Sequence, residues 1–99
     1  MDNAIIDLAP VARPIEDYEA RVNITWAAQN GDLPDPVAYD TPDDQLKTML
    51  VEAITTGSIP GLRADANVDL RDFVVDRFEA TEARPWRAIM VRPKTAFGG

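Results

Sequence analysis

Alternation of apolar and polar residues predicts a half-buried strand near the start of the chain. Over residues 21–27, Val22, Ile24 and Trp26 share one face and polar residues occupy the other. Trp26 is in phase with the two aliphatic residues, so we expect it in the core. This strand is the first element that the pattern indicates with any clarity.

A second short strand is expected at residues 36–39, which carry Val37 and Tyr39 on one face. Asn30-Gly31 lies between the two strands, and this dipeptide is a strong signal for a tight turn. Prolines at 34 and 36 confine the second strand to the edge of a sheet or to its own start. The two strands are therefore predicted to form a hairpin with a long connection.

The helical period is clearest after residue 40. Thr41 suits an N-cap, and Pro42 suits the first helical position. Gly57 is a natural C-cap, and the proline at 60 prevents continuation. Five apolar residues recur at the spacing that buries one helix face for about three turns: Leu46, Met49, Leu50, Ala53 and Ile54.

The remainder is predicted as loop, strand, turn, strand and tail. We expect a loop over 57–67, a short helical turn at 69–72 and a strand at 73–79. A turn at 79–85 leads to a last strand at 86–92, whose mostly apolar residues suggest that both its faces are covered. The environment of Trp86, at the start of this strand, stays open.

This order of elements predicts an α+β fold, with one main helix packed across a mixed sheet. Burying the helix stripe against the strands gives a β-grasp arrangement, in which the first and last strands pair in parallel at the sheet centre. We expect an N-terminal arm at 1–19, one domain at 20–93 and a tail at 94–99. Ile5, Ile6 and Leu8 make the arm apolar enough to dock on the domain or on a partner.

Composition narrows the chemistry. The chain has 99 residues and a net charge of −7, which disfavours nucleic-acid binding. It contains no cysteine and no histidine, so it lacks thiolates and the commonest general base and metal ligand. We expect no enzyme activity, no cofactor and no metal. No apolar run is long enough for a membrane span, and the acidic first ten residues do not resemble a signal peptide, so we expect a cytoplasmic protein.

Three stretches carry a resemblance to a known family. Residues 23–54 (NITWAAQNGDLPDPVAYDTPDDQLKTMLVEAI) resemble the strand–turn–strand–helix opening of ubiquitin-like proteins. Residues 69–75 (DLRDFVV) are similar to the segment before their last strand, and Gly98-Gly99 matches their terminus. The weak apolar character of residues 58–67, the long final hairpin and the extra arm depart from that family.

The resemblance implies a protein modifier, more specifically one of the kind that bacteria encode beside activating and conjugating enzymes. Its Gly99 carboxylate would be activated by an ATP-dependent adenylating enzyme, which holds the ATP and magnesium, and passed to a conjugating enzyme and then a target. A deconjugating protease would reverse the attachment. Within the tail, Gly98 would join Gly99 in the enzyme channel, and recognition would fall to Phe97, Lys94, Pro93 and Arg92. The free protein is expected to be a monomer.

Two alternatives stay open. A sulfur-carrier protein also ends in Gly-Gly and forms a thiocarboxylate there. A small acidic binding module, such as an antitoxin or inhibitor, would need no reactive terminus. The acidic residues at 32, 35, 40, 43 and 44 lack the spacing and glycine of a calcium loop, and we interpret them as helix-capping and solvated charges.

Overall fold

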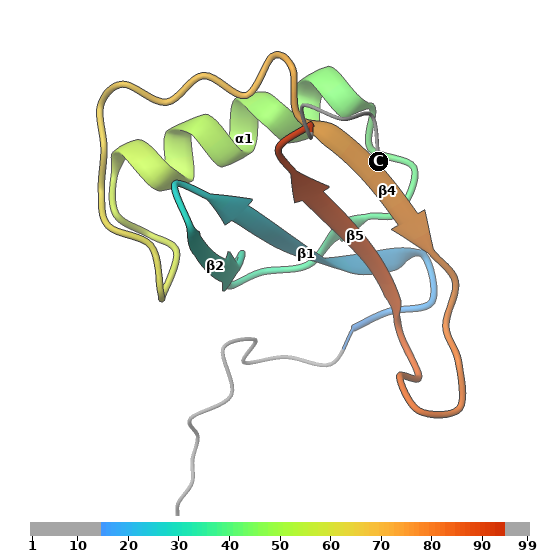
Figure 1. Ribbon diagram of the computed structural model, residues 1–99. Helices are drawn as coiled ribbons and strands as arrows, with labels where there is room; N and C mark the ends of the chain where they lie inside the picture. The colour runs from blue at the N-terminus through green and yellow to red at the C-terminus, as the bar shows by residue number, and fades with distance from the viewer. Residues whose placement is uncertain (1–14, 95–99) are drawn as a thin grey trace, which may run out of the picture.

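The computed structural model describes residues 15–94, which form one helix and five strands (Figure 1). The strands are β1 (Glu19–Trp26), β2 (Gln29–Asp32), β3 (Val37–Ala38), β4 (Val74–Phe78) and β5 (Arg87–Arg92), and the helix is α1 (Asp43–Thr55). β1 begins earlier than the alternation predicted, because Glu19 and Ala20 pair with β3.

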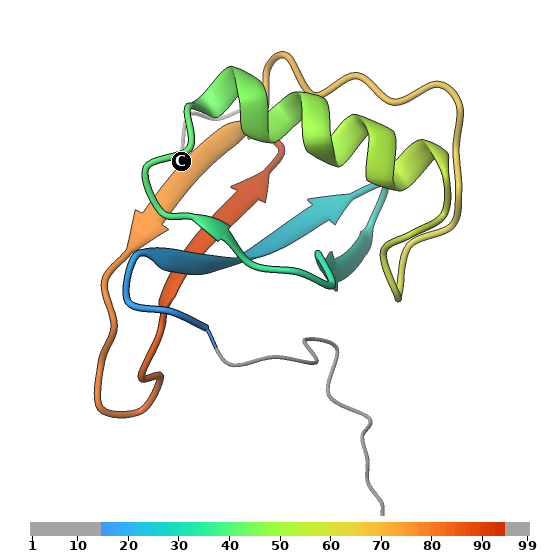
Figure 2. The same cartoon turned by 180° about the vertical axis from the view of Figure 1, so that it is seen from behind.

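The sheet is mixed, in the order β2-β1-β5-β4, with β3 also paired to β1. β1 and β5 run parallel, from Ala20 opposite Arg87 to Ile24 opposite Val91, and all other pairs are antiparallel. The predicted parallel pairing of the first and last strands is therefore confirmed. α1 crosses one face of this sheet, and residues 56–73 return alongside the helix to β4 (Figures 1 and 2).

The core lies between α1 and the sheet. Every second residue of β1 and β5 points into it, which is what the alternation in β1 predicted. Three loop residues, Ile59, Leu62 and Leu70, close its open end. Trp26, which the pattern placed in the core, packs against it but is only half-buried. The fully buried large side chains of the core are Val22, Ile24, Leu46, Leu50, Ile54, Ile59, Leu70, Ile89 and Val91.

The prediction of a turn at Asn30-Gly31 is wrong. The turn between β1 and β2 is made by Ala27 and Ala28, with φ angles of 52° and 61°, and Asn30 pairs with Thr25 inside the ladder. The Asn30 amide donates to the side-chain oxygens of Asn23 and Thr25, so it stabilises the strand pair. The predicted hairpin between residues 21–27 and 36–39 is not found as such. β3 pairs with Glu19 and Ala20, just before the predicted strand, and residues 23–26 pair with β2 instead.

Gly31 is required by a close approach of the loop, not by a turn. A Cβ placed on it would lie 2.3 Å from the carbonyl oxygen of Pro60 and 2.8 Å from Ile59 Cγ2. The loop is further tied to β2 by the backbone N–H of Arg63, which donates to Gln29 Oε1 at 2.9 Å. Glycine at position 31 therefore lets Ile59 enter the core.

The two ends of α1 differ in how well the sequence predicted them. At the N-terminus Thr41 is not the cap: its hydroxyl donates to the Ala38 carbonyl at 2.6 Å, and Pro42 takes the cap position without a side-chain bond. At the C-terminus Gly57 (φ 71°) donates to Ile54 O, and the next residue, Ser58, donates to Ala53 O. These two bonds form a Schellman motif, so the predicted glycine cap is confirmed.

Arg77 ties the N-terminus of α1 to β4. Its guanidinium donates to the Tyr39 carbonyl at 3.1 Å, to Asp43 Oδ1 at 2.8 Å and to the Thr41 carbonyl. Since Arg77 lies on the helix-facing side of β4, opposite Ile89, these bonds hold the segment before the helix against the sheet. Arg77 thus fixes the start of α1 in the absence of a side-chain N-cap from Thr41.

The expectation that both faces of β5 are covered is wrong. Ile89 and Val91 are buried under α1, but Met90 on the other face is 40% exposed. That face has no helix over it in the described part of the chain (Figure 2). The outer face of β5 is therefore only partly covered, since Ala88 is 5% exposed there while Met90 is open to solvent.

Candidate functional site

The candidate site begins where the chain leaves β5. This strand occupies the interior of the sheet, hydrogen-bonded to β1 on one side and β4 on the other. Its last inward residue, Val91, is 1% exposed and lies opposite Ile24 of β1. Because β5 is paired on both sides up to Val91, the segment that follows it starts from the centre of the sheet and not from an edge strand.

Three of the predicted site residues lie in the described structure at this exit. Arg92 donates from Nε and a terminal nitrogen to Asp76 Oδ2, at 3.2 and 2.8 Å. Pro93 follows directly and cannot donate to the ladder, so β5 ends there. Lys94 is exposed. The other predicted residues, Phe97, Gly98 and Gly99, lie outside the described residues.

A shallow hollow lies beside the root of the tail. Lys94 lines it together with Phe73 and Val74 at the start of β4 and with the turn residues Arg71 and Asp72. The sequence placed Lys94 in tail recognition, but the 71–74 side of this hollow was not foreseen as part of that site. The pattern assigned residues 71–72 to a short helical turn and residues 73–74 to the start of a strand. Pairing of β4 with β5 brings them to the exit.

The charged residues near the helix start do not form a metal centre. Within residues 15–94 no group of three or more His, Cys, Asp or Glu side chains is placed to hold a metal ion. Asp32 accepts from the Asn23 amide at 2.8 Å, Asp43 pairs with Arg77, and Asp44 accepts from the N–H of Gln45. These contacts do not include the predicted helix capping, since the N-cap of α1 is Pro42 and has no side-chain hydrogen bond, while Asp35, Asp40, Asp43 and Asp44 are exposed as expected of solvated charges.

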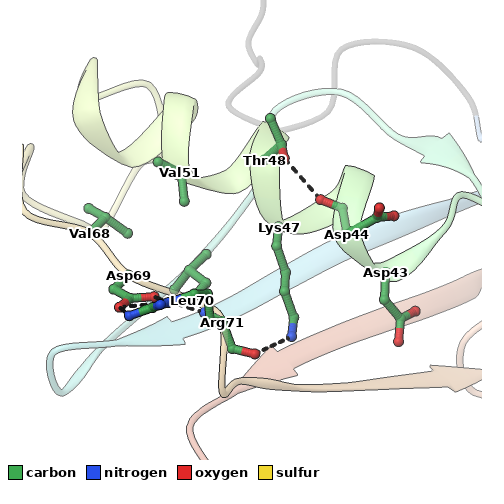
Figure 3. A pocket seen from close by; sticks show the side chains of 9 residues that line it. All are labelled: Asp43, Asp44, Lys47, Thr48, Val51, Val68, Asp69, Leu70 and Arg71. Atoms are coloured by element: carbon green, nitrogen blue, oxygen red, sulfur yellow. Dashed lines mark hydrogen bonds and ion pairs between the residues drawn. The ribbon is translucent and has the colours of Figure 1, made fainter.

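A groove that sequence reasoning missed runs along α1. It lies between the helix and residues 68–71 and has a volume of about 600 Å³ (Figure 3). Arg71 forms an ion pair with Asp69 at 2.7 Å. The guanidinium and the backbone N–H of Arg71 both donate hydrogen bonds to the Asp69 carboxylate, and these bonds lower the Asp69 pKa from 3.8 to about 2. The only local signal was the Asp69-x-Arg71 spacing, since the two walls are some twenty residues apart in the sequence.

The exposed apolar residues gather away from this groove. Phe78 of β4 and Met90 of β5 are 41% and 40% exposed, and both belong to the sheet face opposite α1. Trp86, whose environment the sequence left open, is half-buried, with the Arg21 guanidinium 5.2 Å from its ring centre.

Of the helical segments in residues 15–94, none combines the length and apolar character needed to cross a bilayer.

Comparison of the chain with models of protein families, with characterised proteins and with solved structures gives no match.

Proposed function

We propose that this protein is a ubiquitin-like modifier with a β-grasp fold, whose Gly99 carboxylate is activated and joined to a target. In this scheme the chain is the substrate of an adenylating enzyme, a conjugating enzyme and a deconjugating protease, as in bacterial conjugation systems. The chain contributes recognition and positioning, while the enzymes contribute ATP, magnesium and the reactive cysteine.

The observation that carries the proposal is the position of β5, the strand that precedes the tail in the sequence. In the described structure β5 pairs in parallel with β1 in the sheet interior, with α1 as part of the crossover between them. This strand order, with a helix across one face, supports a β-grasp. A reactive end that continues from such a strand is well anchored for transfer between enzymes.

The residues of the tail suit a terminus that must enter active sites. Glycine has no side chain to clash in a narrow channel, and Gly98-Gly99 would place two such residues at the reactive carboxylate. Six extended residues from Lys94 span about 20 Å at roughly 3.3 Å each, so the domain can stay outside the active site. The proposal requires that Gly99 carry the free carboxylate, directly or after processing.

The remaining tail residues would guide recognition. Lys94 is exposed at the exit and offers a charge to the activating enzyme, whereas Arg92 is already engaged by Asp76 in a partly exposed pair. Such a pair is worth at most about 1 kcal/mol, so an enzyme carboxylate can compete for Arg92. Pro93 would stiffen the exit, and Phe97 would supply an apolar anchor beside the glycines.

The experiment is expression of the tagged chain in the organism that encodes it, followed by denaturing electrophoresis. The wild-type chain should appear in covalent species of higher mass, and the chain lacking Gly98 and Gly99 should not. Ala96→Ser, a change in the same tail outside the glycine pair, serves as the matched control and should leave these species unchanged.

The two competing functions give different results in the same experiment. A sulfur carrier would show no conjugates, and its intact mass would reveal replacement of one terminal oxygen by sulfur. A binding module that acts without conjugation would retain its function after deletion of the two glycines, and that result would contradict the proposal.

A further inference from the structure

The groove along α1 has an apolar floor. Val51 on the helix and Val68 on the loop lie across it from each other, both half-buried, with Leu70 beneath them in the core (Figure 3). The methyl group of Thr48 adds to the same surface, since its hydroxyl is turned to the Asp44 carbonyl at 3.0 Å. A side chain of aliphatic size placed here would cover apolar surface that water now contacts.

The rim of the groove is acidic. Asp43 and Asp44 stand at its helix end, and Asp69 stands on the loop side. The two cations in the lining are engaged within the protein: Lys47 donates to the Arg71 carbonyl at 3.0 Å, and the Arg71 guanidinium is bound by Asp69. Asp43 and Asp69 are themselves ion-paired, with Arg77 and Arg71, so the carboxylate that the groove offers to a ligand is chiefly that of Asp44, on a chain whose net charge is −7.

We propose that this groove is the docking site for a basic segment of a protein partner, which places one aliphatic side chain on Val51 and Val68. Lysine or arginine residues flanking that side chain would meet Asp43 and Asp44. The inference does not use the Gly-Gly terminus, since it rests on the groove between α1 and residues 68–71.

Charge and apolar contact have different roles in this docking. Ion pairs at an exposed rim add little affinity but speed association and select basic over acidic partners. The apolar floor supplies the affinity, and it is small, so we expect a weak, reversible contact. The chain's own residues 95–99 (TAFGG) are a poorer occupant, since they contain no lysine or arginine to meet the rim carboxylates.

The test uses two synthetic peptides of equal length with the same central leucine, one with lysines and one with glutamates at the flanking positions. Each is titrated into the full-length ¹⁵N-labelled protein, and amide shifts are followed by NMR. The lysine peptide should shift the amides of Lys47, Thr48, Val51 and Val68, with a dissociation constant between about 10 μM and 1 mM, and weaken as salt rises. The glutamate peptide should not bind.

Two arginine substitutions on α1 provide matched variants. Thr48→Arg fills the groove and adds positive charge, and should weaken the lysine peptide at least about tenfold. Thr55→Arg makes the same change at an exposed position of the same helix outside the groove, and should alter binding less than about twofold. Asp44→Asn, which keeps an acceptor for the Gln45 N–H, should weaken binding severalfold and supports the assignment if Thr48→Arg perturbs folding.

Several results would overturn the proposal. These are equal binding of both peptides, equal effects of the two arginine variants, or no shift with about 1 mM lysine peptide. Shifts confined to Met90 and Phe78 would place the contact on the other sheet face. Binding that appears only after removal of residues 95–99 would make the tail the occupant, and would equally contradict docking of an external segment.

Discussion

Replacing Gly31 by alanine should destabilise the fold, because the new methyl group meets backbone. The Cβ would lie 2.3 Å from the Pro60 carbonyl oxygen, and it would also touch Ile59 Cγ2 at 2.8 Å and Leu62 Cδ1 at 2.9 Å. The two side chains can turn aside at some cost, but the carbonyl moves only if the loop moves. Since Ile59 and Leu62 are buried, that displacement disturbs the core.

The magnitude follows from two opposing terms. Overpacking of this kind typically costs about 1–3 kcal/mol, and a clash with backbone belongs in the upper part of that range. Alanine also restricts the unfolded chain, which returns about 0.4–1 kcal/mol. We therefore expect the free energy of unfolding to fall by about 2 kcal/mol. With a urea slope of about 1.5 kcal/mol per molar, the midpoint should fall by roughly 1.3 M.

The assay is urea unfolding followed by the fluorescence of Trp26 and Trp86. Gly57→Ala is the control, since its added Cβ meets only Ala64 Cβ at 3.2 Å and its cost of about 1 kcal/mol comes from the positive φ. Gly31→Ala should be the more damaging of the two. A Gly31→Ala protein as stable as the wild type would refute the close contact between β2 and the 59–62 loop.

Substitutions at three further positions probe other parts of the structure. Ala28→Gly should raise the free energy of unfolding by up to about 1 kcal/mol, because φ is 61° there, and a loss of stability in urea melts would contradict a turn at this position. Arg77→Ala should lower the free energy of unfolding by about 2–4 kcal/mol through loss of the bonds to Asp43 and the loop carbonyls. Arg77→Lys should lower it less, and equal, small losses in the two variants would refute the role of Arg77 in holding the helix start. NMR titration should give an Asp69 pKa of about 2, and Arg71→Ala should return it toward 3.8; an unchanged pKa in the variant would refute the pair. Since the folded pKa is the lower one, this pair contributes stability above pH 4 that is lost as pH falls toward 2.

The sequence predicted those elements whose pattern depends on local spacing. The apolar stripe of α1 and the alternation in β1 each reflect burial of one face of the element in the core, and this burial does not depend on the conformation of the loops. Leu46, Leu50 and Ile54 are all fully buried, as the stripe required. Gly57 was found for the same reason, because a helix end needs a residue that accepts a positive φ whatever lies beyond it.

The failures have tertiary causes. Asn30-Gly31 has the sequence of a turn, yet Gly31 is needed by a loop thirty residues later, and two alanines accept the positive φ angles instead. Thr41 has the sequence of an N-cap, but its hydroxyl is taken by the Ala38 carbonyl, and Arg77 from a distant strand holds the helix start. Pro60 and Arg77 are distant in the sequence from Gly31 and Thr41, the residues that they contact, so the local sequence around Gly31 and Thr41 does not reveal either contact.

The candidate site divides in the same way. The exit at Arg92, Pro93 and Lys94 was foreseen because a strand followed by proline is a local pattern. The groove was missed because one wall is helix and the other is loop, and only the fold brings Val51 to Val68. Within residues 69–75 Leu70 is buried in the core, while Asp69 and Arg71 are exposed.

The central claim, that Gly99 is joined to a target, is tested most directly by mass spectrometry after trypsin digestion. Trypsin cleaves after Lys94, and the Arg92–Pro93 bond resists it, so a conjugated target would keep the branch Thr-Ala-Phe-Gly-Gly on its acceptor amine. Cells that express the chain should yield peptides with this branch, and cells that express the form without Gly98 and Gly99 should yield none. Abundant chain with a free terminus and no branched peptide in either sample would contradict the modifier function.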